Sequence, residues 1–426
     1  MDKFAKKGLI IDLVLIVTIF LVLCRGVDEV PFFPDEGQWI ATSGVFEAYF
    51  SGDYDSPIWD INYWTVTQPP LTRYLIGFGR FLGGYSSEQL NTPWDFLNDD
   101  STSSKEGSMP SPGLLFWSRI PMAVLASFSI AIVAVLLHKT VGLTSALIWS
   151  YLSLSNTYFA VMIRRAMGDS PLLFFIVMVT LLSYLYLNQS AFSKKVIIPR
   201  PYLMAIFIGV LVGLAQASKL NGVASIFGGF LVVSAIAVRM DTDRQKQLRY
   251  FLVSVLLLIF VSQLTFLLIY PTLWQMPLKI TILMFKNRGL EMNIQVAANP
   301  QSAINGFIEH LKIVGLRVFQ NYSTINFTGA FWINIPLCLL GLVRSIYEIC
   351  SYVLRKPANS GLIAIFFIGG ATALPSLATP LDWDRYYLLP VFFSTILIAV
   401  GAADVTQRLF RMIVVFVQKR KHSISE

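Results

Sequence analysis

The sequence predicts an all-α protein that crosses a membrane about ten times and carries two large loops on one side. Of its 426 residues, 55% are hydrophobic and only 14% are charged, whereas a soluble domain is about 25% charged. Mean hydropathy is +0.62. Long apolar runs recur along the chain, and in lipid such runs must be helical because unpaired backbone groups are costly there.

The first apolar run follows a basic N-terminus and precedes Arg25. A cleaved signal peptide is the alternative interpretation, but no small-residue cleavage site follows the run, so an uncleaved first span is favoured. Nine more runs are long enough, allowing for tilt, to cross about 30 Å of hydrocarbon. The ten predicted spans are residues 8–23, 115–137, 143–162, 170–188, 202–218, 220–238, 250–270, 327–344, 361–379 and 386–403.

The distribution of basic residues predicts the orientation. Short loops on one side are rich in Lys and Arg, which places them in the cytoplasm together with both termini. We therefore expect an integral plasma (inner) membrane protein, a single domain over 1–426, with a cytoplasmic tail at 404–426. The basic residues of these short loops include Lys3, Lys6, Lys7, Lys139, Lys194, Lys195, Arg200, Arg239, Arg244, Lys246, Arg249, Arg344, Arg355 and Lys356.

Two outer loops remain, at about 24–114 and 271–326. The aromatic residues between Trp39 and Trp64 predict short interfacial helices in the first loop, and its polar second half, Ser86–Gly113, is expected to be irregular. In the second loop Pro277–Phe285 predicts another interfacial helix.

Composition also limits the possible partners. A net charge of +8 suits cytoplasmic loops beside anionic lipid, and the basic residues are too scattered for a nucleic-acid interface. Three scattered histidines argue against a zinc site. A metal ion, if one is used, would be Mg²⁺ or Mn²⁺ on carboxylates, with ligands that the sequence does not identify.

The pair Asp35-Glu36 opens the first outer loop, in the stretch PFFPDEG. A positioned carboxylate can take the proton of an attacking hydroxyl, so the pair is a candidate general base at the membrane surface. The alternative is a solvated acidic loop.

Four motifs follow this pair in order. QPPLTR spans Gln68–Arg73, RRAMGD spans Arg164–Asp169, YPTLWQMP spans Tyr270–Pro277, and LDWDRYY spans Leu381–Tyr387. By the predicted topology, all four lie on the outer side.

With Asp35-Glu36, these motifs resemble the C-type membrane glycosyltransferases, above all the protein O-mannosyltransferases and their bacterial relatives, which include the lipid A aminoarabinose transferases. Those families place an Asp-Glu pair after the first span and a His-Pro-Pro-Leu-Gly-Lys-like motif later in the same loop. Here Gln68 replaces the histidine and Arg73 takes the basic position. The resemblance extends over residues 35 to about 390.

The resemblance implies a polyprenyl-phosphate sugar donor, whose phosphate leaving group needs cations. Arginine suits phosphate oxygens. For each arginine the alternative is lipid headgroup contact or placement at a helix end, and for Arg385 it is a salt bridge to Asp382 or Asp384. The candidate phosphate-binding residues are Arg73, Arg164, Arg165, Arg288 and Arg385, with Lys219 as a further cation.

The candidate acceptor- and sugar-binding residues are Asp169, Trp274, Asp382, Trp383 and Asp384. Asp169 could instead bind a metal or pair with Arg164 or Arg165. The two tryptophans could stack on a sugar or simply belong to the interfacial aromatic belt.

The prediction is a glycosyltransferase that moves a sugar, with inversion, from the lipid phosphate to a hydroxyl group at the outer face. Asp35 would act as base and Glu36 would orient the acceptor, which could be a protein, a glycolipid or a polysaccharide. The alternatives are a lipid-linked-sugar transporter or flippase and a non-catalytic membrane assembly subunit. The predicted spans contain almost no ionisable residue near the midplane, which disfavours a transporter.

Overall fold

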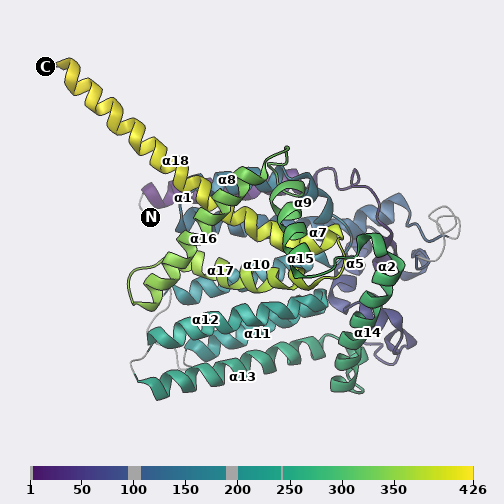
Figure 1. Cartoon of the computed structure of the whole chain (residues 1–426). Coiled ribbons are helices and arrows are strands. Elements are labelled where there is room, and N and C mark those ends of the chain that lie inside the picture. Colours follow the sequence, from purple (N-terminus) through teal and green to yellow (C-terminus); the bar gives the residue numbers. More distant parts are fainter. Residues whose placement is uncertain (1–2, 95–106, 189–199, 241–242, 426) are drawn as a thin grey trace.

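The computed structural model describes residues 3–94, 107–188, 200–240 and 243–425. Across these ranges the chain is helical, and the β structure is limited to one isolated bridge between Ala303 and Leu381. The apolar helices lie roughly side by side in a bundle (Figure 1). The prediction of an all-α fold is therefore confirmed.

Seven helices in the described ranges are long and apolar enough to cross a membrane, and three apolar helices are shorter. Each overlaps one of the ten predicted apolar runs, with bounds that differ by several residues at α13, α16 and α18. The long ones are α7 (Pro112–Thr140), α10 (Asp169–Leu187), α11 (Arg200–Ser218), α12 (Ser225–Met240) with the 3-10 turn Leu220–Ala224 before it, α13 (Arg244–Leu268), α16 (Phe331–Val353) and α18 (Leu388–Ser425); the shorter ones are α8 (Leu143–Leu154), α17 (Ser360–Ala373) and Gly8–Cys24, the apolar part of α1 (Lys3–Cys24).

Two predicted spans are interrupted. The run 143–162 breaks after Leu154, and the Asn156 side chain caps a separate helix, α9 (Thr157–Met162), by accepting a 2.9 Å hydrogen bond from the Phe159 N–H. The run 361–379 leaves the α-helix at Ala373 and continues as a 3-10 turn. Hydropathy averaged over a whole span does not reveal these breaks, although Ser155, Asn156 and Thr157 mark the first and Pro375 follows the second.

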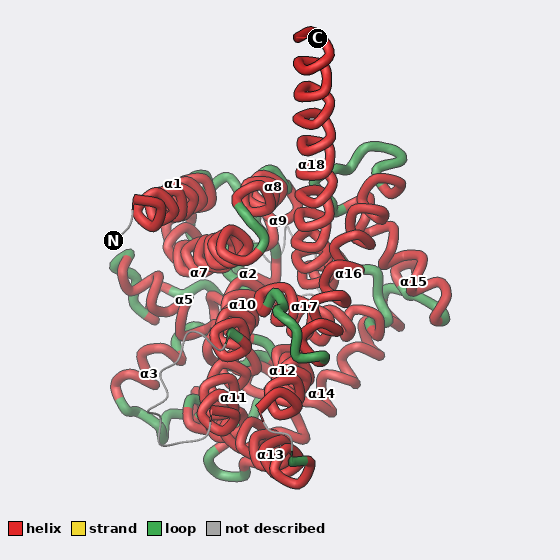
Figure 2. The backbone as a smooth tube through the Cα atoms, turned by 90° about the vertical axis from the view of Figure 1, so that its left-hand side faces the viewer, coloured by secondary structure: helices red, strands yellow, loops and turns green. Residues whose placement is uncertain are grey.

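Small residues bring α16 and α18 into close contact. A Cβ atom added to Gly401 would lie 2.0 Å from the Leu337 carbonyl oxygen, and one added to Gly341 would lie 2.2 Å from that of Leu397. Close backbone approach at glycine is a common way to pack helices in lipid. The end-on view of Figure 2 shows α17 and the helix pair beside it, with α10, α11, α12 and α13 below.

The two outer loops fold into short helices at one end of the bundle (Figure 1). The first loop contains short helices where its aromatics predict them, and the half predicted to be irregular, Ser86–Gly113, includes residues 95–106, which lie outside the described ranges. The helix predicted at Pro277–Phe285 is longer than expected. These elements are α2 (Pro34–Ala41), α3 (Val45–Ser51), α4 (Tyr63–Thr67), α5 (Pro70–Leu82), α14 (Pro277–Ala298) and α15 (Phe307–Leu316), with 3-10 turns at Pro57–Trp59 and Ser87–Gln89.

The last span and the predicted tail form one helix. α18 has 38 residues, about 57 Å at 1.5 Å per residue, so it exceeds the hydrocarbon thickness. Its C-terminal part projects away from the bundle (Figures 1 and 2).

Candidate active site

The first site element is the N-terminus of α2. Pro34 occupies the first helical position, where its missing N–H costs nothing, and Asp35 and Glu36 follow in the first turn, where the helix dipole favours carboxylates. Glu36 accepts a 3.1 Å hydrogen bond from the Phe33 N–H. The motif therefore fixes the direction of both acidic side chains.

Asp35 forms an ion pair with Arg385, 350 residues further along the chain. Both side chains are partly open, with 20% and 17% of their surfaces exposed. Arg385 belongs to the 3-10 turn Asp384–Tyr387 that leads into α18. Its guanidinium lies 4.7 Å from the ring centre of Trp383 and 5.6 Å from that of Tyr386, and the two rings are stacked.

Asp169 lies in the same neighbourhood. Its carboxylate accepts a 2.8 Å hydrogen bond from the Lys219 ammonium group, so its partner is Lys219 rather than Arg164 or Arg165. Asp35 and Asp169 both interact electrostatically with Arg385. α10 supplies Asp169 at its first residue, and the end of α11 is followed directly by Lys219.

A chain of hydrogen bonds brings α14 to this cluster. Arg288 donates to the Glu291 carboxylate at 2.7 Å and to the Tyr386 hydroxyl at 3.2 Å. The Tyr63 hydroxyl of α4 donates to Glu291 at 2.9 Å. Burial, and after it the Glu291 carboxylate, raises the pKa of Tyr63 well above its usual value, so this phenol keeps the proton that it donates.

Glu36 has a different environment from its neighbour. It is fully buried and accepts two hydrogen bonds from Arg119, at 2.8 and 2.7 Å, plus one from the Ala166 N–H at 2.8 Å. Arg119 also donates to the carbonyl of Val30 at 2.7 Å. This network ties the α2 turn to α7 and to the segment before α10, and protein groups donate to both Glu36 carboxylate oxygens.

Three predicted cations form no ion pair in the part of the chain that the structure describes. Arg73 is buried rather than at the surface, and donates to the Gln68 carbonyl at 2.7 Å. Arg165 is 9% exposed, lies 4.3 Å from the Phe33 ring centre, and its Nε has no hydrogen-bond partner. Arg164 donates to a backbone carbonyl of α1.

The remaining predicted residues have mainly structural contacts. Asp382 pairs with Arg317 at 2.6 Å and accepts from the Tyr387 hydroxyl at 2.8 Å, and the Asp384 side chain accepts from a backbone N–H. The predicted structural alternative for Arg385, a salt bridge to Asp382 or Asp384, does not form. Trp274 packs against Tyr54, with ring centres 4.9 Å apart.

The structure thus gathers Asp35, Asp169, Arg288, Trp383 and Arg385 at one end of the bundle. Sequence reasoning missed Glu291 and Tyr63 as members, and it assigned no role to Arg119. A signal existed for Glu291, since it lies three residues after Arg288 and can pair with it within one helix face. No sequence feature indicated Tyr63, because no local pattern pairs an aromatic residue of this loop with a carboxylate 228 residues further along the chain.

By sequence, the chain matches a known protein family. A model of the dolichyl-phosphate-mannose-protein mannosyltransferase family matches residues 38–275. No match was found among curated protein sequences.

The chain is also similar to several solved structures. The chain is similar to ArnT from Cupriavidus metallidurans bound to undecaprenyl phosphate, with a TM-score of 0.53, 15% identity, and coverage of 95% of this chain and 63% of that one. The apo form of ArnT gives a TM-score of 0.50 at 15% identity, covering 96% and 63%. The protein O-mannosyltransferase Pmt1-Pmt2 complex of S. cerevisiae gives 0.44 at 16% identity, covering 63% and 34%.

The chain therefore spans 63% of the length of the ArnT structures it resembles. The family model covers more than half of the chain, from α2 to the turn after α13. Because the family model covers more than half of the chain, the chain belongs to the dolichyl-phosphate-mannose-protein mannosyltransferase family, and its similarity to the ArnT structures shows the C-type membrane fold.

Proposed function

We propose that the protein transfers a sugar from a polyprenyl-phosphate donor to a hydroxyl acceptor, with inversion at the anomeric carbon. The observation that supports this proposal is the Asp35 carboxylate, partly open and beside Arg385, with Asp169, Lys219 and Arg288 near it. A base and several cations at one place suit a reaction that removes a proton and releases a phosphate.

In the proposed step the acceptor oxygen attacks the anomeric carbon from the side opposite the phosphate. The new carbon–oxygen bond forms while the bond from that carbon to the phosphate oxygen breaks. Asp35 takes the hydroxyl proton, and the bonding electron pair leaves with the polyprenyl phosphate. Arg385 has five N–H donors, so it can hold Asp35 and still offer hydrogen bonds to a phosphate oxygen.

The cations of the site differ in whether a carboxylate already balances them. Arg119, Lys219, Arg288 and Arg385 each have a carboxylate partner. Arg73 and Arg165 are buried and have none in the described ranges. A buried charge without a partner is costly, so a phosphate close to either arginine would be strongly stabilised. We assign Arg164, Arg288 and Arg385 as further donor contacts.

The aromatic residues are assigned to the sugar and acceptor side. Trp383 stacks on Tyr386 and lies against Arg385; it is partly exposed, so we assign it to contact with the sugar ring. Asp169 would contact the acceptor. Three further residues would support the site from a greater distance, because their hydrogen-bond partners are protein groups. They are Asp382, Asp384 and Trp274.

The comparisons support the class of donor and suggest an acceptor. One ArnT structure is described as bound to undecaprenyl phosphate, and the family description names dolichyl-phosphate-mannose and protein. We propose a polyprenyl-phosphate-linked sugar, with mannose as the first candidate, and a protein, glycolipid or polysaccharide acceptor.

We propose that side-chain cations, rather than a divalent cation, balance the donor phosphate. In the described ranges no group of three or more His, Cys, Asp or Glu residues could hold a metal ion, and Asp35 and Asp169 are each paired with a cation. The proposed transfer therefore relies on side-chain cations.

We propose the location of the site relative to the membrane from charge. α2 and α14 lie at one end of the bundle, and the end of α12 and the start of α13, which carry Arg239 and Arg244, lie at the other (Figure 1). Basic loops favour the cytoplasm, so we propose that the site faces outward and both termini face inward. Ion pairs gathered at one end, rather than at mid-membrane, also fit an enzyme better than a transporter.

Asp35→Asn is the direct test. Transfer from undecaprenyl-phosphate [³H]mannose in membranes should fall by roughly 10²- to 10⁴-fold, the usual contribution of a general base. Asp60→Asn serves as the matched control, because Asp60 is an exposed carboxylate of the same loop. Full activity of Asp35→Asn at equal expression would rule out the proposed base.

A further inference from the structure

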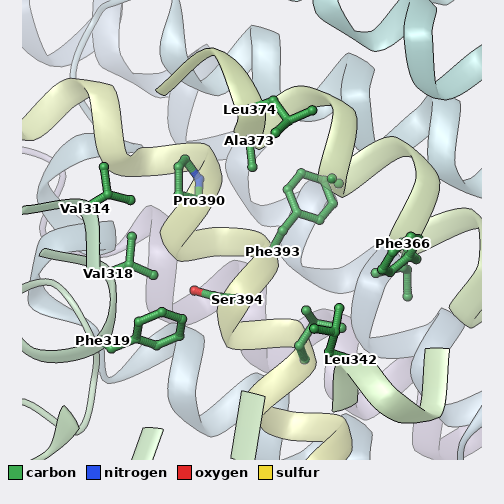
Figure 3. A pocket seen from close by; sticks show the side chains of 14 residues that line it. Val314, Val318, Phe319, Leu342, Phe366, Ala373, Leu374, Pro390, Phe393 and Ser394 are labelled. Carbon is green, nitrogen blue, oxygen red and sulfur yellow. The ribbon is translucent and has the colours of Figure 1, made fainter. Parts of the chain in front are cut away.

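Two cavities of the protein differ in the character of their linings. The first, between α16, α17, α18 and the α15 region, has a volume of about 270 Å³ and is lined mainly by aliphatic and aromatic side chains (Figure 3). The second lies between the end of α12 and the start of α13 and has a volume of about 370 Å³. This α12–α13 groove combines apolar side chains with Arg244 and Gln247, so its lining suits a ligand that is polar at one end.

Helical spacing explains why the α13 side of the groove has this mixed character. Arg244, Gln247, Leu248 and Phe251 all line it. They follow one another at intervals of three or four residues, so they share one face of the helix. Phe251 comes seven residues after Arg244, a rise of about 10 Å, whereas the headgroup region of one leaflet is about 5–8 Å thick. With Arg244 at headgroup depth, Phe251 therefore lies beside hydrocarbon.

A third helix brings another cation to the groove. Arg355 follows α16, and its guanidinium donates to the carbonyl of Val238, a lining residue of α12, at 3.4 Å. Gln247 donates to the same carbonyl at 3.3 Å. Arg239 is the next residue after Val238, and its guanidinium lies 4.4 Å from the ring centre of Tyr352 of α16. The ends of α12, α13 and α16 therefore each contribute a guanidinium group near Val238.

Arg355 has a backbone conformation that usually belongs to glycine. Its φ is +60°, and among the described residues it is the one non-glycine residue with a positive φ. It comes directly after Leu354, the C-cap of α16, at the position where glycine is common because a Cβ atom is unfavourable in the left-handed region. A function of the side chain explains an arginine at this position better than backbone energy does.

The positive charges of the groove are open to an anion. Arg239 and Arg244 form no ion pair within the residues that the structure describes. The carboxylates of these helix ends have other partners, since Asp243 caps the start of α13 and Glu348 pairs with Arg344. Three guanidinium groups also outnumber the carboxylate of Asp243, so the groove has a net positive charge beside its apolar side chains.

We propose that the α12–α13 groove binds an anionic phospholipid. The phosphodiester would lie on Arg244 and Arg355, and the first part of an acyl chain would lie against Leu248 and Phe251. Arginine suits phosphate oxygens, and basic pockets between membrane helices are suited to anionic headgroups. The groove lies at the end of the bundle opposite the polar cluster (Figure 1), the end that we place beside the negatively charged inner leaflet. The site is thus independent of the proposed sugar transfer.

The experiment uses the full-length protein in phosphatidylcholine nanodiscs that contain a trace of photoreactive phosphatidylglycerol, with a diazirine near the carbonyl end of one acyl chain. Labelled peptides are identified by mass spectrometry. We expect labelling at the end of α12 and the start of α13, about tenfold stronger than with phosphatidylcholine that carries the same diazirine, because charge-assisted hydrogen bonds hold the anionic lipid. Excess unlabelled phosphatidylglycerol should prevent this labelling.

Arg244→Gln removes the charge from the lining and keeps a good helix former at this position. Labelling of the groove should fall about tenfold, to the level of the phosphatidylcholine probe. Arg249→Gln is the matched control, because it removes the same charge from an exposed position of the same helix, outside the lining of the groove. Labelling of this control should equal that of the natural protein.

Arg355→Gly separates a ligand contact from a structural role. Glycine suits a φ of +60°, so the unfolding temperature in detergent should not fall, whereas labelling of the groove should fall several-fold. A lower unfolding temperature with undiminished labelling would contradict the assignment of Arg355 to the lipid phosphate.

Equal labelling by the two photoreactive lipids would overturn the proposal, because the groove would then hold any bilayer lipid. Equal losses in Arg244→Gln and Arg249→Gln would also overturn it, since a general attraction between basic residues and anionic lipid would account for them. Undiminished labelling of Arg244→Gln would have the same consequence.

Discussion

Two adjacent carboxylates, Asp35 and Glu36, have different environments because successive residues of a helix point about 100° apart. Asp35 faces the partly open cluster and meets Arg385, whereas Glu36 faces the interior and meets Arg119. The sequence motif identified the pair as important. The packing of α2 decides which of the two acids can contact a substrate. Glu36, which is buried, holds the partly open Asp35 in place.

The buried pair should be important for stability. Glu36→Gln leaves the Arg119 charge buried with a neutral partner, a change that typically costs about 3–5 kcal/mol when one member of such a pair is lost. We expect a clear fall in the unfolding temperature in detergent. Glu88→Gln, at an exposed carboxylate of the same loop, should change it little, and equal unfolding temperatures for both variants would contradict the assigned role.

Asp382 should make stability depend on pH in acid. Burial opposes its ionisation, but hydrogen bonds from Arg317 and Tyr387 outweigh that effect and lower the pKa of the carboxyl. A lowered pKa stabilises the fold above the unfolded value of about 3.9, and this stabilisation is lost as the pH falls through the lower folded value. The unfolding-temperature difference between the natural protein and Asp382→Asn should therefore shrink below about pH 4; a difference that grows on acidification would be inconsistent with this account.

At the scale of elements, α14 depends on a few polar contacts to hold its inner face against the site. Ile280 and Met284 are buried, while Leu278 and Ile282 are 74% and 58% exposed, as expected for an interfacial helix that rests partly in lipid. Glu291 joins Tyr63 of α4 to Arg288. The carboxylate is thus a positioning residue for Arg288.

Glu291→Gln should release Arg288 from its fixed position. Loss of a charge-assisted hydrogen bond predicts a rise in the donor KM of roughly tenfold, with a smaller change in kcat. Steady-state kinetics with undecaprenyl-phosphate mannose measure both constants. Glu309→Gln on α15, where the carboxylate accepts a bond from Asn305, is the control. A fall in kcat alone would contradict a role in donor positioning.

At the scale of the whole molecule, the polar cluster and the adjoining ends of α12 and α13 lie at opposite ends of the bundle (Figure 1). α2 and α14 belong to the first end, and the second carries the basic residues Arg239 and Arg244. Exposed positions are available at both ends: Asp55 lies in the first outer loop and Lys356 follows α16. The two positions allow a direct measurement of orientation.

Cysteine labelling should show opposite accessibility for these two positions. In a background where Cys24, Cys338 and Cys350 are replaced, Asp55→Cys should react with a membrane-impermeant maleimide in intact cells. Lys356→Cys should react only after the membrane is opened. The reverse pattern would place the site in the cytoplasm and overturn the proposed outward-facing transfer.

The sequence by itself determined the fold class, the ten apolar helices and the catalytic candidate. Apolar runs are a local property that lipid converts into helices, and the motif around Asp35 includes its own helix start in Pro34. Only the tertiary structure decided the partners. Arg385 meets Asp35 across 350 residues, Asp169 pairs with Lys219, and Arg355 reaches the end of α12, because these contacts depend on how separate helices pack, which no local pattern specifies.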